Sequence, residues 1–341
     1  MNGERKQVNS YNFRPIRLGI PSKGRMEVET QNFLKSCGFS ITRNNRQYIG
    51  YIQEPISIQL VFEHQEDIIR SIRNGTIELG IVGYDLYKEI VPNKDDNILL
   101  IHDSLNFGAC NLEIAVPEIW PEKSMEEIKE RCNDILKVAT KFPKLTKDFL
   151  TAQDFCFEII EGKGSLEVYP ELGRSDLIVD LVSTGQTLKD NHLKMVDGGT
   201  ILNSQAVLIG SKKALMDPSV LKVTRELIEY FEATLRAQKF VSVFVNIRGA
   251  NEEEISKAIF AKKGLSGLQG PTISPVYSKS GEKMFAIHVI VEKEKLQLAI
   301  RNLREIGGSG VVVAQTLYIF EEEPLRFKKL KEKLEKVNED I

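Results

Sequence analysis

The chain has 341 residues, of which 42% are hydrophobic and 28% charged, and its formal net charge is −2. This is the composition of a soluble globular protein, and the length predicts two or three domains. The near-neutral charge gives no support to nucleic acid as the main partner, so any site for anions must be local. No apolar run is long enough to span a membrane, and the N-terminus lacks the apolar core of a signal peptide. We therefore expect no membrane partner and a cytoplasmic protein, or a plastid one if a transit peptide has been removed.

The cysteines are scattered and lack the spacing of metal ligands: Cys37, Cys110, Cys132 and Cys156. This usage is typical of a reducing compartment, in which free cysteines serve as small core residues. We expect neither a disulfide framework nor a dedicated metal cage.

The first predicted strand, Ile16–Pro21, runs into a basic glycine turn at Ser22–Arg25, and a helix is expected over Met26–Cys37. A strand, a turn and a helix in this order place cations and free backbone N–H groups at a helix N-terminus. Lys23 and Arg25 would therefore suit a polyphosphate. The alternative is that they are two solvated surface cations.

Repeated strand–helix units predict a parallel α/β sheet, with further strands at Ser57–Phe62 and Leu79–Val82. Ligands of such sheets bind at the carboxyl ends of the strands. Asp85 lies in a loop of this kind, as do Lys23 and Arg25. We expect the three side chains to share one edge of the sheet.

A second α/β unit is predicted between about Gly108 and Val196, with strands at Leu112–Val116, Leu136–Thr140, Phe155–Ile160 and Leu177–Val182. Three of its loops follow strands and carry polar or small residues: Lys141, the Gly164–Ser165 turn and the Ser183–Thr187 turn. We expect these loops to converge on one crevice.

The Ser183–Thr187 turn, S-T-G-Q-T, follows the buried strand Leu177–Val182 and precedes a short helix expected from about Leu188. Its hydroxyls, free N–H groups and helix dipole suit a phosphate monoester, and Gly185 lets the backbone approach the anion. Asp180 and Asp176 precede the turn, where carboxylates accept hydrogen bonds from sugar hydroxyls. The competing interpretation is an ordinary helix N-cap.

After a flexible break at Gly198-Gly199, an apolar strand over Ile201–Ile209 and a long helix over Pro218–Gln238 are expected to return the chain to the first unit. This connectivity predicts two lobes with a cleft between them, a common place for a ligand.

The segment Val241–Phe320 is predicted to be a separate module with the order β-α-β-β-α-β of ferredoxin-like domains. It contains no cluster of acid, base and nucleophile, so we expect a regulatory or assembly domain that binds a small ligand. The highly charged tail from Glu321 onward is expected to form a solvated helix.

The segment D-L-V-S-T-G-Q-T-L (Asp180–Leu188) resembles the phosphoribosyl-pyrophosphate loop of ATP phosphoribosyltransferase, the first enzyme of histidine biosynthesis. Further segments resemble the family's other motifs in the same order: L-G-I-P-S-K-G-R (Leu18–Arg25), L-G-I-V-G-Y-D (Leu79–Asp85), V-A-T-K-F-P (Val138–Pro143), G-S-L-E (Gly164–Glu167) and G-L-Q-G-P-T-I-S-P-V (Gly267–Val276). The last of these, with I-G-G-S-G-V-V-V (Ile306–Val313), is typical of the long form with a regulatory domain, and plant-type sequences look most similar. The resemblance covers about Ile16 to Glu323.

The resemblance implies an α/β fold with a two-lobed, periplasmic-binding-protein-like catalytic core and a C-terminal ferredoxin-like, ACT-like regulatory domain. The expected domains are residues 14–107 with 197–238 as lobe I, 108–196 as lobe II, 239–323 as the regulatory domain and 324–341 as a charged tail.

The implied reaction joins N1 of the ATP adenine to C1 of phosphoribosyl pyrophosphate and releases pyrophosphate. Both substrates are polyanions, so the site must concentrate cations and N–H donors locally. Cleavage at C1 develops oxocarbenium character, and Mg²⁺ offsets the charge of the leaving pyrophosphate while bound mainly through substrate oxygens. Because adenine N1 is itself nucleophilic, positioning and charge stabilisation suffice without a general base.

The same resemblance implies roles for individual residues. Lys23 and Arg25 are expected to hold the pyrophosphate or the ATP phosphates, and Asp180, in preference to Asp176, to engage the ribose hydroxyls. Lys141 would add positive charge from the second lobe. The other expected substrate contacts are the 5′-phosphate loop and four residues outside it: Ser183, Thr184, Gly185, Gln186, Thr187, Gly164, Ser165, Glu167 and Asp85. Glu167 and Asp85 are candidates for ribose, adenine or Mg²⁺ contacts.

For the C-terminal module the resemblance implies histidine binding and feedback inhibition, which would be allosteric. The expected contacts are Leu268, Gly270, Thr272, Ile273 and Ser274. A homohexamer is also implied, and closed symmetry fits a domain that assembles subunits.

Two competing hypotheses remain at this stage. A two-lobed α/β core also occurs in non-enzymatic proteins that bind small ligands, so the fold alone does not decide the function. The second competing hypothesis is a catalytically dead regulatory paralogue. The presence of the expected site residues argues against it: Lys23, Arg25, Asp180 and Ser183–Thr187.

Overall fold

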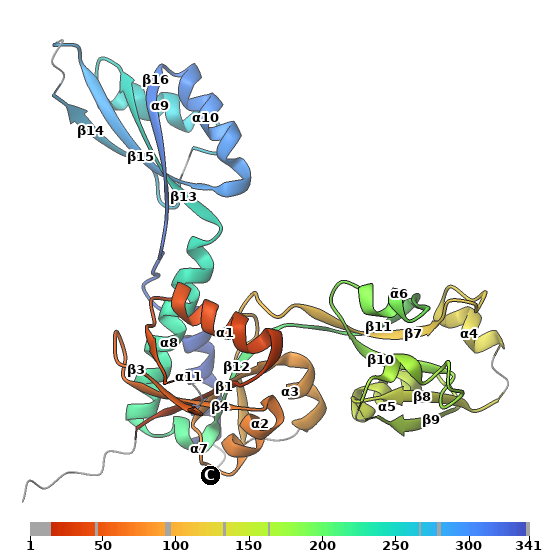
Figure 1. Cartoon of the computed structure of the whole chain (residues 1–341). Coiled ribbons are helices and arrows are strands. Elements are labelled where there is room, and N and C mark those ends of the chain that lie inside the picture. The colour runs from red at the N-terminus through yellow and green to blue at the C-terminus, as the bar shows by residue number, and fades with distance from the viewer. Residues whose placement is uncertain are drawn as a thin grey trace, which may run out of the picture. The chain divides into compact units, whose positions relative to one another are not determined.

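The computed structural model describes residues 15–44, 47–92, 97–131, 134–162, 164–265, 267–277 and 281–338. The chain forms two compact units (Figure 1). One unit holds the chain up to Glu226 together with the segment from Arg326, and the other holds Leu227–Leu325. The predicted limits of the two lobes, the regulatory domain and the tail stay a prediction, because these units group the chain differently.

The first sheet of the larger unit is seven-stranded, in the order β2 (Ile41–Thr42), β3 (Ile49–Ile52), β4 (Ile58–Glu63), β1 (Arg17–Pro21), β5 (Leu79–Gly83), β12 (Ala206–Ser211) and β6 (Ile98–His102). The strand β1 pairs in parallel with β4 and β5, as the repeated strand–helix pattern predicted. The short strands β2 and β3, and the strand β6, were not predicted. Their carboxyl ends do not contribute to the predicted site.

The helices of this half of the unit are α1 (Gly24–Ser36), α2 (Gln65–Arg73), α3 (Tyr84–Ile90) and α7 (Lys212–Leu215). The helix α2 buries Ile68, Ile69 and Ile72. Their spacing of three and four residues places them on one face of the helix. It lies so close to β5 that a Cβ at Gly80 would be 2.5 Å from Ile68 Cγ2. Close packing of the helix on the sheet therefore requires glycine at this position.

The second sheet is five-stranded, in the order β11 (Leu193–Ser204), β7 (Cys110–Pro117), β10 (Leu177–Val182), β8 (Leu136–Thr140) and β9 (Phe157–Glu161). Its other elements are α4 (Met125–Arg131), α5 (Pro143–Ala152), the 3₁₀ turn η1 (Leu166–Val168) and α6 (Gln186–Asp190). Because β10, β8 and β9 are parallel neighbours, their carboxyl ends meet at one edge of the sheet. Alternate residues fill a core on each face, with Leu177 and Val179 on one side and Ile178 on the other.

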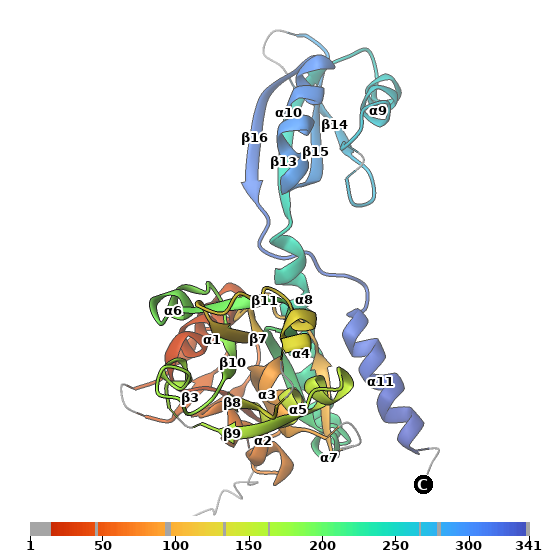
Figure 2. The ribbon, with the colours of Figure 1, turned by 90° about the vertical axis from the view of Figure 1, so that its right-hand side faces the viewer.

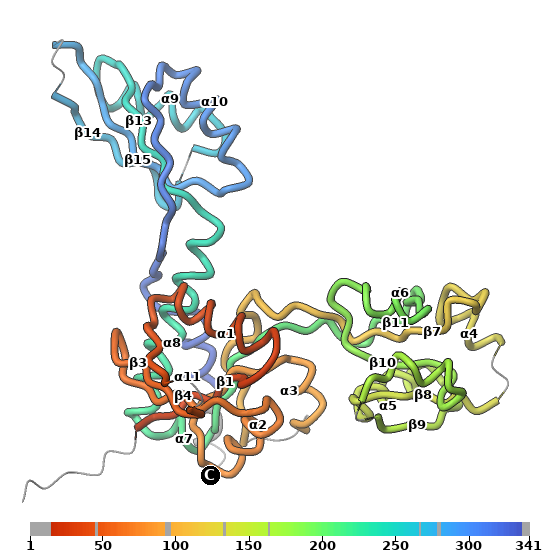
Figure 3. The backbone as a smooth tube through the Cα atoms, in the orientation of Figure 1, coloured from red at the N-terminus to blue at the C-terminus, as the bar shows by residue number. Residues whose placement is uncertain are grey.

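The strands β7 and β11 pair side by side and lead the chain out of the first sheet into the second and back (Figure 3). The predicted break at Gly198-Gly199 is wrong, because β11 is continuous and absorbs the glycines in a register shift between Met195 and Thr200. The single strand predicted over Ile201–Ile209 is also wrong. The chain turns at Gln205, so that its first half belongs to β11 and its second half to β12 of the other sheet.

The smaller unit contains a four-stranded antiparallel sheet in the order β14 (Thr272–Val276), β15 (Met284–Glu292), β13 (Phe240–Arg248) and β16 (Gly308–Gln315). Its helices are α9 (Glu252–Phe260) and α10 (Leu296–Glu305), the latter preceded by the 3₁₀ turn η2 (Lys293–Lys295) (Figure 2). The predicted β-α-β-β-α-β order is thereby confirmed. The last strand ends at Gln315, earlier than the predicted Ile319.

The helix α8 (Pro218–Ala237) precedes this sheet, and the helix α11 (Leu325–Asn338) follows it. The prediction of a helical tail is confirmed, but the prediction that it is solvated is wrong. The side chains of Phe327, Leu330 and Leu334 are buried, and Arg326 binds Asp103 through both Nε and Nη2 at 2.8 Å. Each buried apolar side chain stabilises the docked helix by about 1.5–3 kcal/mol relative to an exposed one.

The cysteines do not all serve as core residues. Cys37 is buried, Cys110 is half-buried and Cys156 is exposed, so the core interpretation is wrong for Cys156. Cys132 lies outside the described residues. Within the described part of the chain, none of the helices combines the length and the apolar character needed to cross a membrane.

Candidate functional site

The Ser183–Thr187 loop lies at the carboxyl end of β10, where the sequence placed it. Gly185 has a φ of 73° and forms the N-cap of α6, which begins at Gln186, two residues earlier than predicted. Gly185 is buried, whereas Ser183, Thr184 and Thr187 are exposed. The left-handed conformation explains why glycine is needed here, and the hydroxyls are left accessible to a ligand.

Lys141 and Asp180 lie at the carboxyl ends of the neighbouring strands β8 and β10, and their Nζ and Oδ2 atoms are 3.6 Å apart. The Asp180 side chain is only 16% exposed and that of Lys141 is 41% exposed. Burial raises the pKa of Asp180, although the Leu181 N–H, 2.8 Å from Oδ1, and the Lys141 ammonium partly offset that effect. The pair thus holds a carboxylate whose charge depends on the adjacent cation.

Glu167 lies on η1, directly after β9, and its charge also raises the pKa of Asp180. Its Oε2 atom is buried and has no hydrogen-bond partner among the described residues. A buried carboxylate oxygen without a partner is costly, so this atom is a candidate for a contact that a ligand completes. Gly164 and Ser165 precede it and are exposed.

Asp176 is the one predicted substrate contact in this sheet that the structure separates from the rest. It precedes β10, at the end of the strand opposite the Ser183–Thr187 loop. Its carboxylate accepts a hydrogen bond from the Lys137 N–H at 2.7 Å, and the Asp176 N–H donates to the Lys137 carbonyl at 2.8 Å. This arrangement fixes the start of the strand pair and leaves Asp180 as the carboxylate beside the loop.

The first sheet carries the other predicted residues after β1 and β5, which are adjacent parallel strands. Lys23 is exposed at the N-cap of α1. Arg25 is also exposed; it donates a hydrogen bond to the Ala109 carbonyl at 2.9 Å and forms an ion pair with Glu29 at 3.2 Å. The two cations and Asp85 therefore lie along one edge of this sheet, as expected.

Asp85 is 5% exposed and comes at the start of α3. The hydroxyl of Ser204 donates to Asp85 Oδ1 at 2.5 Å and accepts a hydrogen bond from the Asp85 N–H at 2.9 Å. Burial raises the pKa of Asp85, and the Ser204 hydroxyl and two backbone N–H groups act in the opposite direction.

Sequence reasoning missed Ser204 and Cys110, which are paired at the ends of β11 and β7. Burial raises the pKa of the Cys110 thiol and the nearby Asp85 raises it further, whereas Ser204 and Arg25 lower it. A signal for Ser204 was present, because the polar run Asn203-Ser204-Gln205 interrupts an otherwise apolar stretch.

Glu113 was also missed. It is 5% exposed and lies opposite Asp180 in the antiparallel pair of β7 and β10. The Thr200 hydroxyl lies 3.0 Å from both of its carboxylate oxygens. Its signal was an acidic residue at the centre of the apolar strand predicted over Leu112–Val116. Cross-strand partners face the same side of a sheet, so a second carboxylate lies beside Asp180.

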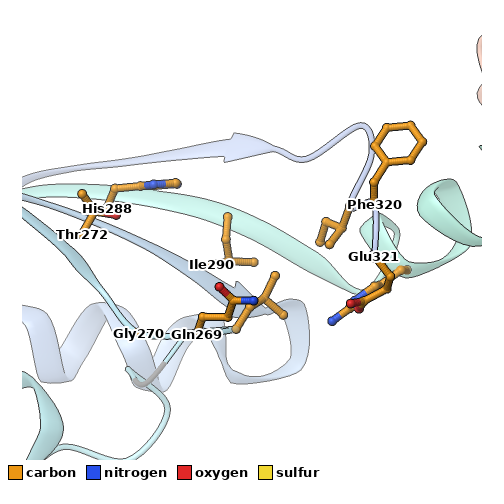
Figure 4. Close-up of a pocket in the computed structure, with 10 residues that line it drawn as sticks. Gln269, Gly270, Thr272, His288, Ile290, Phe320 and Glu321 are labelled. Carbon is orange, nitrogen blue, oxygen red and sulfur yellow. The ribbon is translucent and has the colours of Figure 1, made fainter. Parts of the chain in front are cut away.

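The smaller unit contains a pocket of about 440 Å³ beside the sheet (Figure 4). Of the predicted histidine contacts, Leu268, Gly270 and Thr272 line it. Ile273 instead packs against the core of this unit, and neither Ile273 nor Ser274 lines the pocket. Alternation along the strand puts Ile273 on the face opposite Thr272, whereas Ser274 shares the face of Thr272 but lies outside the pocket lining.

Charged and polar groups border the same pocket. Arg236 and Glu321 form an ion pair at its edge. His288 stacks on Phe244 with ring centroids 4.5 Å apart, and its Nε2 lies 2.7 Å from the Ser242 hydroxyl. His288 also lines the pocket (Figure 4). The pocket thus offers both signs of charge and hydrogen-bonding side chains to a small zwitterion.

Among the described residues, no three His, Cys, Asp or Glu side chains are grouped so that they could hold a metal ion.

Comparison with known proteins gives concordant matches along most of the chain. Residues 64–235 match the family model described as "HisG: ATP phosphoribosyltransferase", and residues 237–316 match "HisG, C-terminal domain". An Arabidopsis thaliana protein named "ATP phosphoribosyltransferase 2, chloroplastic" is 38% identical, covering 97% of this chain and 83% of the relative. An ATP phosphoribosyltransferase of Methanococcus maripaludis (strain C5) is 32% identical over 87% of this chain and 97% of its own length. Among solved structures, the ATP phosphoribosyl transferase (HisG:HisZ) complex from Thermotoga maritima matches 64% of this chain and 98% of its own, with 25% identity and a TM-score of 0.50.

Proposed function

The chain belongs to the ATP phosphoribosyltransferase family, and we propose that the edge of its second sheet binds phosphoribosyl pyrophosphate while the edge of its first sheet binds ATP. The resemblance predicted from the sequence is thereby confirmed. A member of this family is a pentosyltransferase that joins the two substrates in the first step of histidine biosynthesis. The observation that supports our placement is the Lys141–Asp180 pair beside the exposed hydroxyls of the Ser183–Thr187 loop.

The 5′-phosphate occupies the Ser183–Thr187 loop in this proposal. The hydroxyls of Ser183, Thr184 and Thr187 donate to the phosphate oxygens, together with backbone N–H groups of the turn. Gln186 begins α6 and is exposed beside them. The ribose then extends toward Asp180, whose carboxylate accepts hydrogen bonds from the sugar hydroxyls.

The reaction is a substitution at C1 of the ribose. The bond between C1 and the pyrophosphate oxygen breaks, and its electron pair leaves with the pyrophosphate. The lone pair of adenine N1 forms the new C1–N1 bond. Positive charge develops on the ribose between these events, so the nearby carboxylates of Asp180, Glu113 and Glu167 stabilise it electrostatically.

In the proposed transition state, cations stabilise the leaving pyrophosphate. The leaving pyrophosphate gains negative charge, which Lys141 can offset from the second sheet and Lys23 and Arg25 from the first. The exposure of Lys23 and Arg25 fits contacts with large, hydrated polyanions. We propose no general base, because the attacking lone pair on N1 needs no deprotonation.

We propose Mg²⁺ as the metal of this reaction. The site is suited to it in one respect, since Mg²⁺ prefers oxygen ligands and Glu167 offers a buried carboxylate oxygen without a partner among the described residues. Glu167 would hold the ion together with substrate oxygens. When bound, the metal would offset the charge of the pyrophosphate.

For the smaller unit we propose histidine binding in the pocket lined by Leu268, Gly270 and Thr272, with feedback inhibition of the transferase. The support is that Arg236 and Glu321 both line this pocket, which therefore offers a cation to the carboxylate and an anion to the ammonium group of an amino acid. We also propose a homohexamer, because closed symmetry fits a regulatory domain that also assembles subunits.

We propose a cytoplasmic or plastid location. The plastid alternative is supported by two Arabidopsis relatives whose names include "chloroplastic". Imaging of a chain tagged at its C-terminus in the source cell would decide between the two compartments.

The activity is tested with Mg-ATP and phosphoribosyl pyrophosphate, by following the release of pyrophosphate with and without millimolar histidine. ATP-dependent release that histidine suppresses supports both proposals. Release that is insensitive to histidine keeps the transferase and removes the regulatory proposal. A folded chain that releases nothing contradicts the proposed reaction and favours a ligand-binding protein without catalysis.

A further inference from the structure

The two strands that connect the sheets, β7 and β11, each contact a residue of the proposed ATP site at the end that is nearer the first sheet. At the start of β7, the Ala109 carbonyl accepts the hydrogen bond from Arg25 at 2.9 Å. At the end of β11, Ser204 bonds to Asp85. Since Ser204 and Cys110 are paired across the two strands, these contacts come from one place in the fold.

The loop that carries Asp85 is fastened to the end of β11 at several points. The Tyr84 N–H donates to the Gln205 carbonyl at 2.9 Å, next to the two bonds between Ser204 and Asp85. A Cβ at Gly83 would overlap Asp85 Oδ1, so the glycine leaves the space that this side-chain position requires. The position of the carboxylate is therefore set by its neighbours on both sides.

We propose that Ser204 is a positioning residue of the transferase, which orients the Asp85 carboxylate toward the ATP and links its placement to the strand that arrives from the second sheet. The inference rests on the proposed function, because it takes Asp85 to be a contact of the nucleotide. The chemistry fits a group that is both donor and acceptor. The hydroxyl donates a hydrogen bond to the Asp85 carboxylate and accepts one from the N–H of the same residue, which a hydrophobic side chain cannot do.

The surroundings of Asp85 define the expected pH behaviour. The titratable and charged groups near this cluster are the Cys110 thiol on β7 and Arg25 and Glu29 on α1. The Ser204 hydroxyl stabilises the charged carboxylate and lowers its pKa, against the larger effect of burial. Loss of the hydroxyl must therefore raise the pKa of Asp85, so that activity that needs the carboxylate disappears at a higher pH during acidification.

The test compares Ser204→Ala and Ser204→Thr with Ser211→Ala in the full-length chain. Ser211 is as buried as Ser204, at 6% exposure, and lies at the end of β12, where its hydroxyl accepts the Ala214 N–H at 3.3 Å. We expect Ser204→Ala to lower kcat/KM for ATP by about 10- to 100-fold, the range for a lost hydrogen bond to a charged group. Its acidic limb should move to higher pH. Ser204→Thr should restore both quantities toward the wild type, and Ser211→Ala should change neither kcat/KM for ATP nor the position of the acidic limb.

A second comparison keeps the result independent of folding defects. In an Asp85→Asn background, Ser204→Ala should cause no further loss of kcat/KM, because the two residues act as a unit. Full additivity of the two losses, or a Ser204→Ala enzyme with the wild-type pH profile, would overturn the inference while leaving the transferase in place. A wild-type chain without activity overturns the proposed function instead, and this inference with it.

Discussion

The ammonium group of Lys141 lies 3.6 Å from the carboxylate of Asp180, and the two residues come from adjacent parallel strands that end at the same edge of the second sheet. Both side chains lie at the strand ends next to the Ser183–Thr187 loop, whose hydroxyls are exposed. The pair can therefore hold a cationic ribose and an anionic leaving group on either side of one bond.

Replacement of Lys141 should affect both the rate and its pH dependence. Lys141→Met removes a cation that lowers the pKa of Asp180, so the carboxylate should become protonated at a higher pH. We expect kcat to fall by about 10- to 100-fold and the acidic limb of kcat/KM to move upward in pH. The control is Lys137→Met, an exposed lysine on the same strand. If both variants behave alike, the Lys141–Asp180 pair has no special role.

An acidic side chain in the phosphate loop should repel the substrate. Thr184→Glu places a carboxylate beside the expected position of the 5′-phosphate, so KM for phosphoribosyl pyrophosphate should rise by more than about 10-fold, since like charges at close range cost several kcal/mol. KM for ATP should change much less. Thr151→Glu, at an exposed position of α5, should leave both constants as they are. An unchanged KM in Thr184→Glu would remove the loop from the site.

A bulky side chain in the pocket of the smaller unit should block the proposed histidine site. Thr272→Trp should raise the histidine concentration that halves the activity by at least about 10-fold, because the indole occupies the space of the ligand. Basal activity should persist. Ser274→Trp is the matched comparison, since Ser274 lies on the same strand but does not line the pocket. Equal effects of the two substitutions would argue against this pocket as the histidine site.

The docked helix α11 should contribute measurably to stability. Leu330 is 2% exposed, whereas Leu325 at the start of the same helix is 68% exposed. Leu330→Ala should lower the free energy of unfolding of the larger unit by about 2–5 kcal/mol, and Leu325→Ala by less than about 0.5 kcal/mol. Denaturant unfolding of the two variants measures the difference. Equal stabilities would mean that the helix is not docked in solution.

His102 should make the chain sensitive to acid. It is fully buried, its Nε2 has no partner among the described residues, and its pKa is lowered to about 3 by burial and by the positive charge of Arg326, with Asp103 acting in the opposite direction. Between its ordinary pKa of 6.5 and about 3, the unfolded chain binds a proton that the folded chain does not. Stability should therefore fall as the pH falls through this window.

Substitution of His102 tests whether stability falls with falling pH because of this residue. His102→Gln keeps a hydrogen-bonding side chain but does not titrate, so its loss of stability between pH 6.5 and pH 4 should be smaller than that of the wild type. Thermal unfolding at several pH values gives the comparison. A wild-type profile as flat as that of the variant would contradict the buried neutral imidazole.

Much of the fold could be predicted from local patterns. The strands Leu136–Thr140 and Leu177–Val182 were predicted with their observed limits. These features depend on side-chain alternation along a few residues, which is a property of the sequence itself. The motif order likewise identified the family, because chemistry at a strand end needs short runs of particular residues.

The sequence by itself determined most of the elements, the glycine turn after β10 and the family; the tertiary structure decided which polar residues meet. Ser204 and Asp85 are 119 positions apart, and only the turn of the chain from β11 into β12 brings them together. Asp176 and Asp180 are both acidic residues shortly before the Ser183–Thr187 loop in the sequence. In the structure Asp176 lies before the start of β10, whereas Asp180 lies toward its carboxyl end. Pairing between distant strands and burial of a helix face arise from contacts across the whole chain, so no short segment carries a signal for them.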